Sequence, residues 1–343
     1  MKKTILHISA SSDFGGGPDF ILDLCKYSKN NSYYYCGPKG AKLKYISKYC
    51  KIISNNMLFF FNPLIIRQII NLKIKNIHLH GRGALIANLI NLIIIKFFAK
   101  QLEFNIIFTP HGVGIRYSII DYFLNIYCNY FVDILTFVSK DELYVYKKKY
   151  NLRTNYLIIK NGIFISKKIS KKKKKNKNII SFSRFNKQKN SIEICKIASK
   201  LTDYNFYFFG SGPEKINCIK YCISNNLKNV FFKDFTSKPE RAILNGFCYL
   251  SSSNFEGLPL SVLKAIYLER SICLSNVPGH KEFSNLNFKN IRYYKLGNIK
   301  SAVNCILKLY HKFNRETNKS YFDTFKAHYD LRLTVKKYNS IYI

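Results

Sequence analysis

The chain has 343 residues, of which 47% are hydrophobic and 16% aromatic, a composition typical of globular proteins and long enough for two domains of roughly 150 residues each. Its 56 Lys and Arg residues against 19 Asp and Glu give a formal net charge of +37. This excess favours polyanions or anionic membrane surfaces as partners, although a coding bias toward Lys, Asn and Ile explains it equally well. Composition therefore excludes a disordered chain and leaves the partner open.

The ten cysteines contain no C-x-x-C pair, and the closest two, Cys218 and Cys222, have no His or second Cys pair nearby to complete a zinc site. We expect reduced, mostly buried thiols of a cytoplasmic protein. The N-terminal apolar run is too short for a secretory signal and contains His7. The most apolar stretch, residues 84–99, is interrupted by Asn and Lys and is shorter than the roughly 20 residues that span a bilayer, so a packed helix is expected there.

Short apolar runs alternate with segments of helical period along the first half of the chain, a pattern typical of βαβ units with parallel sheets. Strands are expected at residues 3–9, 33–36, 51–53, 77–80, 105–109, 134–138 and 156–160. Helices are expected at residues 18–28, 63–72, 84–99, 119–131 and 140–150, with Pro18 and Pro63 in first turns. Residues 1–166 should form one doubly wound, Rossmann-like domain.

A low-complexity stretch with eight lysines, residues 167–177, follows this half. It has nothing to bury and repels itself, so we place the domain linker there, as a solvated loop or as a patch for phosphates or lipid headgroups. Strands are then expected at residues 178–182, 204–209, 229–232, 247–250 and 271–274, and helices at 188–200, 213–225, after Pro239, 259–269 and 299–313. Residues 178–320 should form a second Rossmann-like domain, with an amphipathic closing helix over 321–343 packing back on the first domain.

Glycine and histidine residues follow several strands of the first half. Gly16 and Gly17 lie between a strand and a helix, where glycine lets backbone N–H groups approach a phosphate. The run fits neither the dinucleotide fingerprint nor the P-loop, so an ordinary tight turn is the alternative. His80 and His111 each precede a glycine at a strand end, where an imidazole binds a sugar hydroxyl or a phosphate oxygen, or is simply structural.

The second half contains a candidate diphosphate site. Arg184 and Lys189 follow a strand, and together they offer a planar fork of donors and a mobile point charge. A glycine turn from Gly210 through Gly212 to Pro213 is shaped to let a nucleobase lie against backbone. By itself that turn is only a loop.

Glu256 is the most informative acid of the chain. It lies just ahead of a predicted helix whose first-turn residue is Pro259, so its carboxylate can point into a ligand crevice in front of that helix's positive end. The alternative is an ordinary acid at a helix start. Lys264 lies about two turns further along the same helix.

The region from Glu256 to Ala265, EGLPLSVLKA, resembles the E-x7-E region of retaining glycosyltransferases of family 4. These bacterial enzymes of glycan, lipopolysaccharide and capsule synthesis have the GT-B fold, an α/β architecture of two facing Rossmann-like domains with parallel sheets. Arg184 and Lys189 are similar to the family's diphosphate-binding pair, and His111 to the His beside the donor sugar. The other similar segments are 15–17, 161–162, 210–213, 277–280 and the closing helix.

The resemblance implies a glycosyltransferase that moves a sugar, with retention of configuration, from a nucleotide donor such as a UDP-sugar to a glycan or lipid-linked acceptor. Glu256 and His111 would be catalytic, and Gly257, Leu258 and Pro259 would lie beside the donor sugar. Arg184, Lys189, Gly16 and Gly17 would bind the diphosphate, and Gly210, Gly212, Pro213 and Lys264 the nucleoside. No metal or other cofactor is expected, because cations and helix ends take its role.

Localisation and partners follow from the same resemblance together with the charge. A cytoplasmic protein peripheral to the inner face of a bacterial membrane is expected, with an anionic membrane surface as partner and no nucleic acid, since no nucleic-acid motif is present. The departure from the family pattern is Lys264, where a second Glu usually accepts hydrogen bonds from the ribose; an ammonium group cannot accept them. The alternative reading is therefore a non-catalytic nucleotide-sugar-binding or scaffold protein of the same fold.

Overall fold

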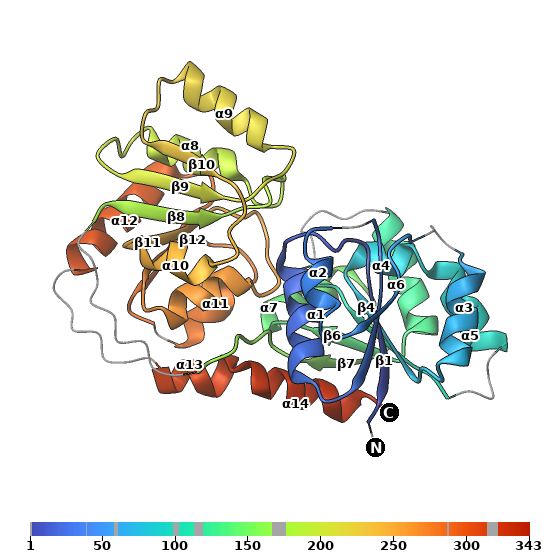
Figure 1. Ribbon diagram of the computed structural model, residues 1–343. Helices are drawn as coiled ribbons and strands as arrows, with labels where there is room; N and C mark the ends of the chain where they lie inside the picture. The colour runs from blue at the N-terminus through green and yellow to red at the C-terminus, as the bar shows by residue number, and fades with distance from the viewer. Residues whose placement is uncertain are drawn as a thin grey trace. The chain divides into compact units, whose positions relative to one another are not determined.

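The computed structural model of the protein describes residues 2–38, 40–57, 61–98, 103–112, 119–166, 176–286, 288–313 and 322–343. The chain divides into two compact units: unit 1 comprises Met1–Asn161 and Leu331–Ile343, and unit 2 comprises Gly162–Asp330. Each unit is a parallel sheet covered by helices on both faces (Figure 1). The predicted α/β fold class is confirmed.

The sheet of unit 1 has seven strands in the order β3-β2-β1-β4-β5-β6-β7, all parallel to their neighbours. The strands are β1 (Thr4–Ser9), β2 (Asn31–Cys36), β3 (Lys51–Ser54), β4 (Asn76–His80), β5 (Asn105–Thr109), β6 (Ile134–Phe137) and β7 (Asn155–Ile158). The helices are α1 (Gly16–Tyr27), α2 (Leu43–Ile46), α3 (Pro63–Asn71), α4 (Arg82–Ile86), α5 (Leu89–Phe98), α6 (Ile119–Phe131), α7 (Lys140–Lys149) and α14 (Leu331–Ile341).

Both faces of this sheet are buried, which explains why its central strands read as continuous apolar runs. On β5, Ile106 and Phe108 enter one core with the helices α3 to α7, while Ile107 between them enters the other. That second core also contains Phe20 of α1 and Tyr338 of α14. The last helix of the chain therefore completes the first unit.

The sheet of unit 2 has six strands in the order β10-β9-β8-β11-β12-β13, again all parallel. The strands are β8 (Asn178–Phe182), β9 (Asn205–Phe209), β10 (Val230–Lys233), β11 (Cys248–Ser251), β12 (Ser271–Ser275) and β13 (Ile291–Tyr294). The helices are α8 (Ser191–Ala198), α9 (Lys215–Ser224), α10 (Pro239–Leu244), α11 (Leu260–Tyr267), the 3-10 helix η1 (Lys281–Leu286), α12 (Ile299–Phe313) and α13 (Phe322–Tyr329). Helices α8, α9 and α12 share one core, and α11 contacts both α10 and α13 (Figure 1).

Both units have the doubly wound strand order, in which the chain first adds strands on one side of the first strand and then reverses. The reversal lies between β1 and β4 in unit 1 and between β8 and β11 in unit 2. In such sheets ligands bind beyond the carboxyl ends of the strands at this switch point, where the two outgoing turns diverge and leave a crevice. A ligand site is therefore expected at the turns after these four strands.

The structure corrects two predicted helices. The helix predicted over 84–99 is interrupted by a turn at Ala87 and Asn88, and its described part belongs to two helices, α4 and α5; at the interruption the Asn88 amide donates to the Ala84 carbonyl at 2.9 Å. The closing helix over 321–343 is also two helices, α13 and α14, which belong to different units. They separate at Asp330, which forms an isolated parallel bridge with Ile163.

The division between the units also differs from the predicted one. Residues 162–166, expected in the first domain, group with unit 2, where the Ile163 N–H donates to the Tyr329 carbonyl at 2.9 Å. Most of the predicted lysine-rich linker, residues 167–175, lies outside the described residues. Strand β13 was not predicted, because an edge strand needs fewer apolar residues than a central one and its sequence is IRYY.

None of the helices in the described ranges is long and apolar enough to cross a membrane.

Candidate functional site

The turns after β8 and β11 of unit 2 meet at the switch point and carry three predicted charged site residues, Arg184, Lys189 and Glu256. The strands pair directly, with Ile180 opposite Tyr249. Beyond them the Asn254 N–H donates to the Gln188 carbonyl at 2.8 Å, which ties the two turns together. Parallel neighbours end at the same edge of a sheet, so side chains 67 residues apart in sequence become adjacent here.

Glu256 and Lys189 form an ion pair within this edge. The Lys189 Nζ lies 2.5 Å from Glu256 Oε1, and the side chains are only 16% and 7% exposed. Ser253 Oγ donates to the same carboxylate oxygen at 2.6 Å. The geometry places the acid and one of the two predicted cations in contact.

The pKa of Glu256 is set by two opposing effects. Burial acts to raise it, but the charges of Lys189 and His280 and the hydrogen bonds from Lys189 and Ser253 outweigh burial and hold the pKa below its ordinary value. The carboxylate therefore stays ionised at neutral pH. It can stabilise positive charge or accept a hydrogen bond, but it cannot serve as a resting proton donor.

Arg184 lies on the same turn as Lys189 but does not touch Glu256 directly. Its Nη2 donates to Gln188 Oε1 at 3.3 Å, and Gln188 Nε2 donates to the Phe255 carbonyl at 3.0 Å. Gln188 thus links the guanidinium to the residue before Glu256. Since Arg184 is exposed, its remaining donors are open to an anion.

The glycine turn after β9 packs on the backbone of the Arg184 turn. Gly210 and Gly212 have φ values of +133° and +145°, and a Cβ on either would collide with the carbonyl of Ser183 or Arg184. The Glu214 N–H also donates to the Phe185 carbonyl at 2.7 Å, next to Pro213. These glycines are required by close backbone approach, which is a structural reason for them beside the predicted contact with a nucleoside.

The loop after β12 supports Glu256 from the other side. The Glu256 N–H donates to the Pro278 carbonyl at 3.2 Å. Gly279, at φ +82°, lies so close that a Cβ there would collide with the Glu256 carbonyl. Next to it, His280 is fully buried, with Nδ1 2.9 Å from the Ser275 carbonyl and Nε2 without a hydrogen-bond partner among the described residues.

Helix α11 starts directly behind the acid. Gly257 and Leu258 are buried in the connecting turn, and Pro259 is the N-cap rather than the predicted first-turn residue. Further along the helix, Lys264 forms an ion pair with Glu240 of α10, with Nζ 3.0 Å from Oε1. Sequence reasoning did not anticipate this carboxylate partner.

In unit 1 the predicted histidines belong to a buried chain of imidazoles. His111 Nε2 lies 3.1 Å from His80 Nδ1, and His80 Nε2 lies 3.1 Å from His7 Nδ1. His78 forms hydrogen bonds with the hydroxyl of Tyr342, which follows α14, and with the Thr109 hydroxyl, each at 2.8 Å. These residues come from the ends of β1, β4 and β5, on both sides of the switch point of this unit.

Burial keeps these imidazoles neutral. It lowers the pKa of His7 to about 3 and of His111 to about 4, and the pKa values of His78 and His80 also lie well below the ordinary value. In a neutral chain each ring donates one hydrogen bond and accepts another, so the hydrogen bonds of His80 fix the tautomer of His111. His80 was predicted as a candidate, whereas the role of His7 in this chain was missed.

The backbone beyond His111 is held by Glu142 of α7. Its carboxylate accepts hydrogen bonds from the N–H groups of Gly112, at 2.5 Å, and Val138, at 2.7 Å. His111 itself has φ +58°, an uncommon conformation for a side-chain-bearing residue. Burial raises the pKa of Glu142 to about 7, against the effect of the two backbone hydrogen bonds.

Gly16 and Gly17 open α1 instead of preceding it. Neither has an atom within 4 Å of the position that a Cβ would take, so the space over this first turn is open. The turn carries no side-chain cap. The backbone N–H groups of this first turn receive no hydrogen bond acceptor from a capping side chain, and such groups at a helix N-terminus can bind an anion.

Within the described part of the chain, the candidate group of metal ligands is His7, His78 and His80, whose nearest nitrogens all lie within 4.8 Å of one another. All three rings already make hydrogen bonds within the protein. The Glu256 cluster offers a single carboxylate beside an ammonium group, a donor set that does not suit a divalent ion.

Comparison with known proteins adds a family match for unit 2. Residues 163–320 match the model of the family described as glycosyl transferases group 1, a match that covers less than half of the chain. The matched segment contains Arg184, Lys189 and Glu256. No curated protein sequence shows a significant match.

Solved structures resemble the chain over almost its whole length. Alr3699/HepE of Anabaena, solved with UDP and glucose, superposes with a TM-score of 0.82 at 12% identity over 98% of both chains. A glycosyltransferase from Rickettsia africae ESF-5 gives 0.76 at 17% identity over 99% of this chain and 98% of its own. The lipopolysaccharide outer core galactosyltransferase WaaB gives 0.67 at 16% identity, with the same shares.

Identities this low establish the fold alone, which is GT-B. With the family match over the second unit, the findings support a glycosyltransferase of GT-B fold.

Proposed function

We propose that the protein transfers a sugar from a nucleotide-sugar donor, a UDP-sugar in the first instance, to a glycan or lipid-linked acceptor in bacterial surface polysaccharide synthesis, with retention of configuration and without a metal ion. The observation that carries this proposal is the Lys189–Glu256 ion pair at the switch point of unit 2, with Arg184 on the same turn. The similarity to Alr3699/HepE, which was solved with UDP and glucose, supports the choice of donor, and the similarity to the lipopolysaccharide galactosyltransferase WaaB supports the choice of pathway.

The chemistry follows from the charges at this turn. When the bond between sugar and diphosphate breaks, negative charge grows on the leaving phosphate and positive charge on the sugar ring. Arg184 and Lys189 provide preorganised cationic donors for the first charge, and the ionised Glu256 provides an anion for the second. In this proposal the two side-chain cations stabilise the leaving phosphate in place of a divalent ion. Transfer should therefore proceed in the presence of a chelator.

We also propose that Glu240 supplies the hydrogen-bond acceptor that Lys264 lacks. Lys264 Nζ lies 3.0 Å from Glu240 Oε1, and the Glu240 side chain is 48% exposed. A carboxylate has several acceptor sites, so one bond to Lys264 leaves others for ribose hydroxyls. In this arrangement Lys264 positions a carboxylate on the neighbouring helix in place of one of its own.

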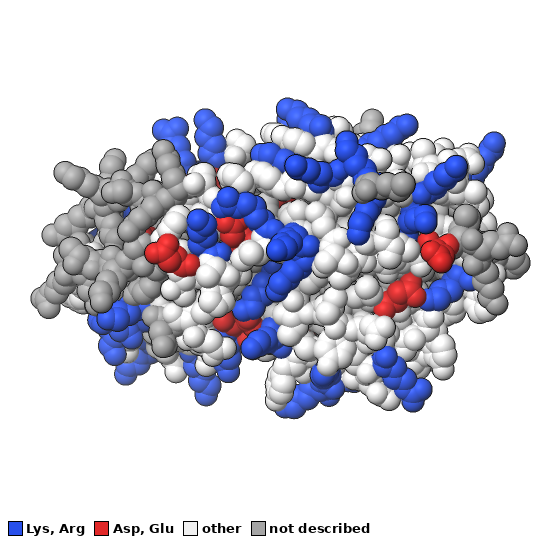
Figure 2. All heavy atoms as spheres, turned by 90° about the horizontal axis from the view of Figure 1, so that it is seen from below, with Lys and Arg blue, Asp and Glu red and all other residues white. Residues whose placement is uncertain are grey.

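We propose that the acceptor is presented at an anionic membrane surface on the cytoplasmic side. Lys and Arg dominate the charged side chains of the face in Figure 2. In unit 1, α6 exposes apolar side chains at helical spacing, namely Ile119, Phe123, Ile126 and Tyr130. Apolar groups on a basic protein suit the boundary between headgroups and acyl chains.

The test is a panel of nucleotide sugars screened first for thermal stabilisation and then for release of the nucleoside diphosphate with and without chelator. Glu256→Gln should lower turnover by about 100- to 1000-fold, as expected for a group that stabilises transition-state charge. The control Asp203→Asn, an exposed acid of the same unit, should match wild type. If the protein bound a donor but showed no turnover with any combination of donor and acceptor, the alternative of a non-catalytic nucleotide-sugar-binding protein would be favoured.

A further inference from the structure

A polar pocket lies on unit 2, between the edge strand β13 and helix α12. Its volume is about 340 Å³. It is lined by Arg292 from the strand and by Lys300, Ser301, Asn304, Cys305 and Lys308 from the helix. Because these helical positions recur every four residues, they form one continuous stripe facing the groove.

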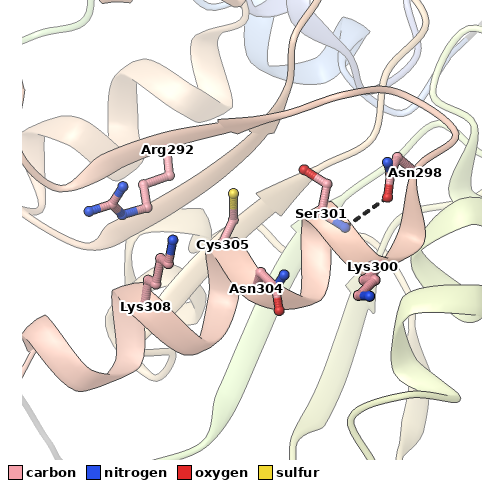
Figure 3. Close-up of a pocket in the computed structure, with 7 residues that line it drawn as sticks. All are labelled: Arg292, Asn298, Lys300, Ser301, Asn304, Cys305 and Lys308. Atoms are coloured by element: carbon pink, nitrogen blue, oxygen red, sulfur yellow. Dashed lines mark hydrogen bonds between the residues drawn. The ribbon is translucent and has the colours of Figure 1, made fainter.

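The charge of this pocket is uncompensated. No acidic side chain lines it, and among the described residues no carboxylate forms an ion pair with Arg292, Lys300 or Lys308. In Figure 3 the Lys308 side chain extends toward Arg292, whose guanidinium points away from Cys305. The Arg292 Nε is buried and has no hydrogen-bond partner among the described residues. A buried donor without a partner, in a pocket lined by unpaired cations, is an arrangement that an anion would satisfy.

The pKa of the Cys305 thiol depends in part on the same charges. Its pKa is lowered to about 7, first by a hydrogen bond with the Cys273 thiol and then by the charges of Arg292 and Lys308. The other nine cysteines are buried, whereas Cys305 is partly exposed. A thiolate of this kind in an accessible position reacts selectively with electrophiles.

We propose that the pocket between β13 and α12 is an anion site that binds a phosphate-bearing ligand, with Arg292, Lys300 and Lys308 as its cationic donors. Ser301 and Asn304 add neutral hydrogen-bonding groups on the same helix face. The site shares no residue with the Glu256 turn, which is formed by the segments after β8 and β11. The ligand is a free phosphate compound or a phospholipid headgroup, since both present the same oxygens.

Alkylation of Cys305 by iodoacetamide, followed by peptide mass mapping, measures occupancy of this pocket directly. A bound phosphate group shields the thiolate and offsets the cations that stabilise it. Inorganic pyrophosphate should therefore slow alkylation of Cys305 by roughly threefold or more, compared with sodium chloride at the same ionic strength. Equal rates in the two salts, together with no protection by the anionic vesicles described below, would overturn the proposal.

Charge variants test whether the protection arises in the pocket. In the Arg292→Gln/Lys308→Gln variant, and in the exposed single variant Lys308→Gln, the pyrophosphate concentration for half-protection should rise by roughly tenfold or more. Lys196→Gln/Lys220→Gln removes two exposed charges from α8 and α9 and should leave that concentration unchanged. Protection that survives in the pocket variants contradicts the proposal.

Two further arms separate this site from the proposed donor site and identify the source of the phosphate. In the variant Arg184→Gln/Lys189→Gln, pyrophosphate should still protect Cys305. If protection were lost in this variant and kept in the pocket variants, the effect would originate at the Glu256 turn.

Vesicles containing phosphatidylglycerol are compared with phosphatidylcholine vesicles. Protection by the anionic vesicles but not by pyrophosphate assigns a lipid headgroup, the reverse assigns a free phosphate, and protection by neither overturns the inference.

Discussion

Lys189 and Glu256 are joined by a 2.5 Å contact between Nζ and Oε1 in a part of unit 2 where both side chains are largely buried. Replacing a buried ion pair by apolar groups is often neutral or stabilising, so such a pair is weak evidence for a role in stability. Its position at the carboxyl ends of β8 and β11 is instead the place where doubly wound sheets bind ligands. This position is the basis of our proposal that the contact belongs to a ligand site.

The first prediction concerns the energetics of that pair. Lys189→Gln leaves the Glu256 carboxylate buried without its counter-charge and should lower the free energy of unfolding by about 3 kcal/mol. Glu256→Gln should cost less, because Lys189 is more exposed and can turn to water. The double variant should be less destabilised than the sum of the single ones.

Urea unfolding of the four proteins measures this coupling. Lys196→Gln, at an exposed position on α8, is the control for a simple loss of charge. Additive effects, or a Lys189→Gln protein as stable as wild type, would show that the two groups are not coupled.

The second prediction concerns Gly279. Gly279→Ala would place a Cβ against the Glu256 carbonyl as well as straining a backbone at φ +82°, so the Glu256 turn must move. Gly297→Ala has the same φ of +82° but meets no atom within 4 Å, and so isolates the strain alone. That strain should cost about 1–2 kcal/mol in both variants.

Thermal unfolding and nucleoside diphosphate release check the two alanine variants side by side. Gly279→Ala should be the less stable one and should lose transfer activity, whereas Gly297→Ala should keep it. Equal activities would mean that close packing of Gly279 on Glu256 is unimportant.

The third prediction tests the role proposed for Glu240. Glu240→Gln should weaken binding of UDP by about tenfold, since a charged hydrogen bond to the ribose is lost. Binding of 2′-deoxy-UDP should change little, because it lacks one of the hydroxyls. The charge-reversed variant Glu240→Lys/Lys264→Glu keeps one carboxylate and one ammonium in place and should bind UDP better than Glu240→Gln.

Isothermal titration calorimetry with the two nucleotides distinguishes the cases. If Glu240→Gln weakened the binding of both nucleotides equally, the carboxylate would not be acting on the ribose 2′-hydroxyl. The proposed transfer reaction would be unaffected by that result.

The fourth prediction concerns pH. Burial lowers the pKa values of His7, His78, His80 and His111 in the folded protein, whereas unfolding returns them to about 6.5. The unfolded chain therefore binds more protons as the pH falls. The stability that these neutral rings contribute is complete above about pH 6.5 and is lost as the pH falls toward their folded values, about 4 for His111 and about 3 for His7.

Each ring should account for about 2 kcal/mol of the stability lost between pH 7 and pH 5. His80→Asn, which cannot titrate, should reduce that loss by about this amount in urea unfolding at the two pH values. His311→Asn, at an exposed position on α12, is the control and should follow wild type. Parallel pH profiles for wild type and His80→Asn would contradict the buried neutral chain.

Much of the fold follows from local sequence. Apolar runs marked every strand except β13, and the Gly and Pro residues between them marked most turns, because burial on both sheet faces requires continuous apolar strands. The same alternation implied the doubly wound order. Arg184, Lys189 and Glu256 were also identifiable, since each follows a strand at an edge where ligands bind.

Contacts between distant segments were not predictable in the same way. Glu240 with Lys264, Glu142 with Gly112 and His7 with His80 are pairs whose contact depends on which strands and helices become neighbours. Similarly, the helical period of residues 321–343 did not reveal that the helix breaks at Asp330 and that only α14 belongs to unit 1.

The amino-acid order by itself thus determined the elements, the α/β class and the charged groups at the ends of β8 and β11, because these depend on side chains close together in the chain. Only the tertiary structure decided which partner each buried charge and each imidazole has. The reason is physical: a pKa, an ion pair and a tautomer are set by atoms within a few ångströms in space, and strand order rather than sequence distance brings those atoms together.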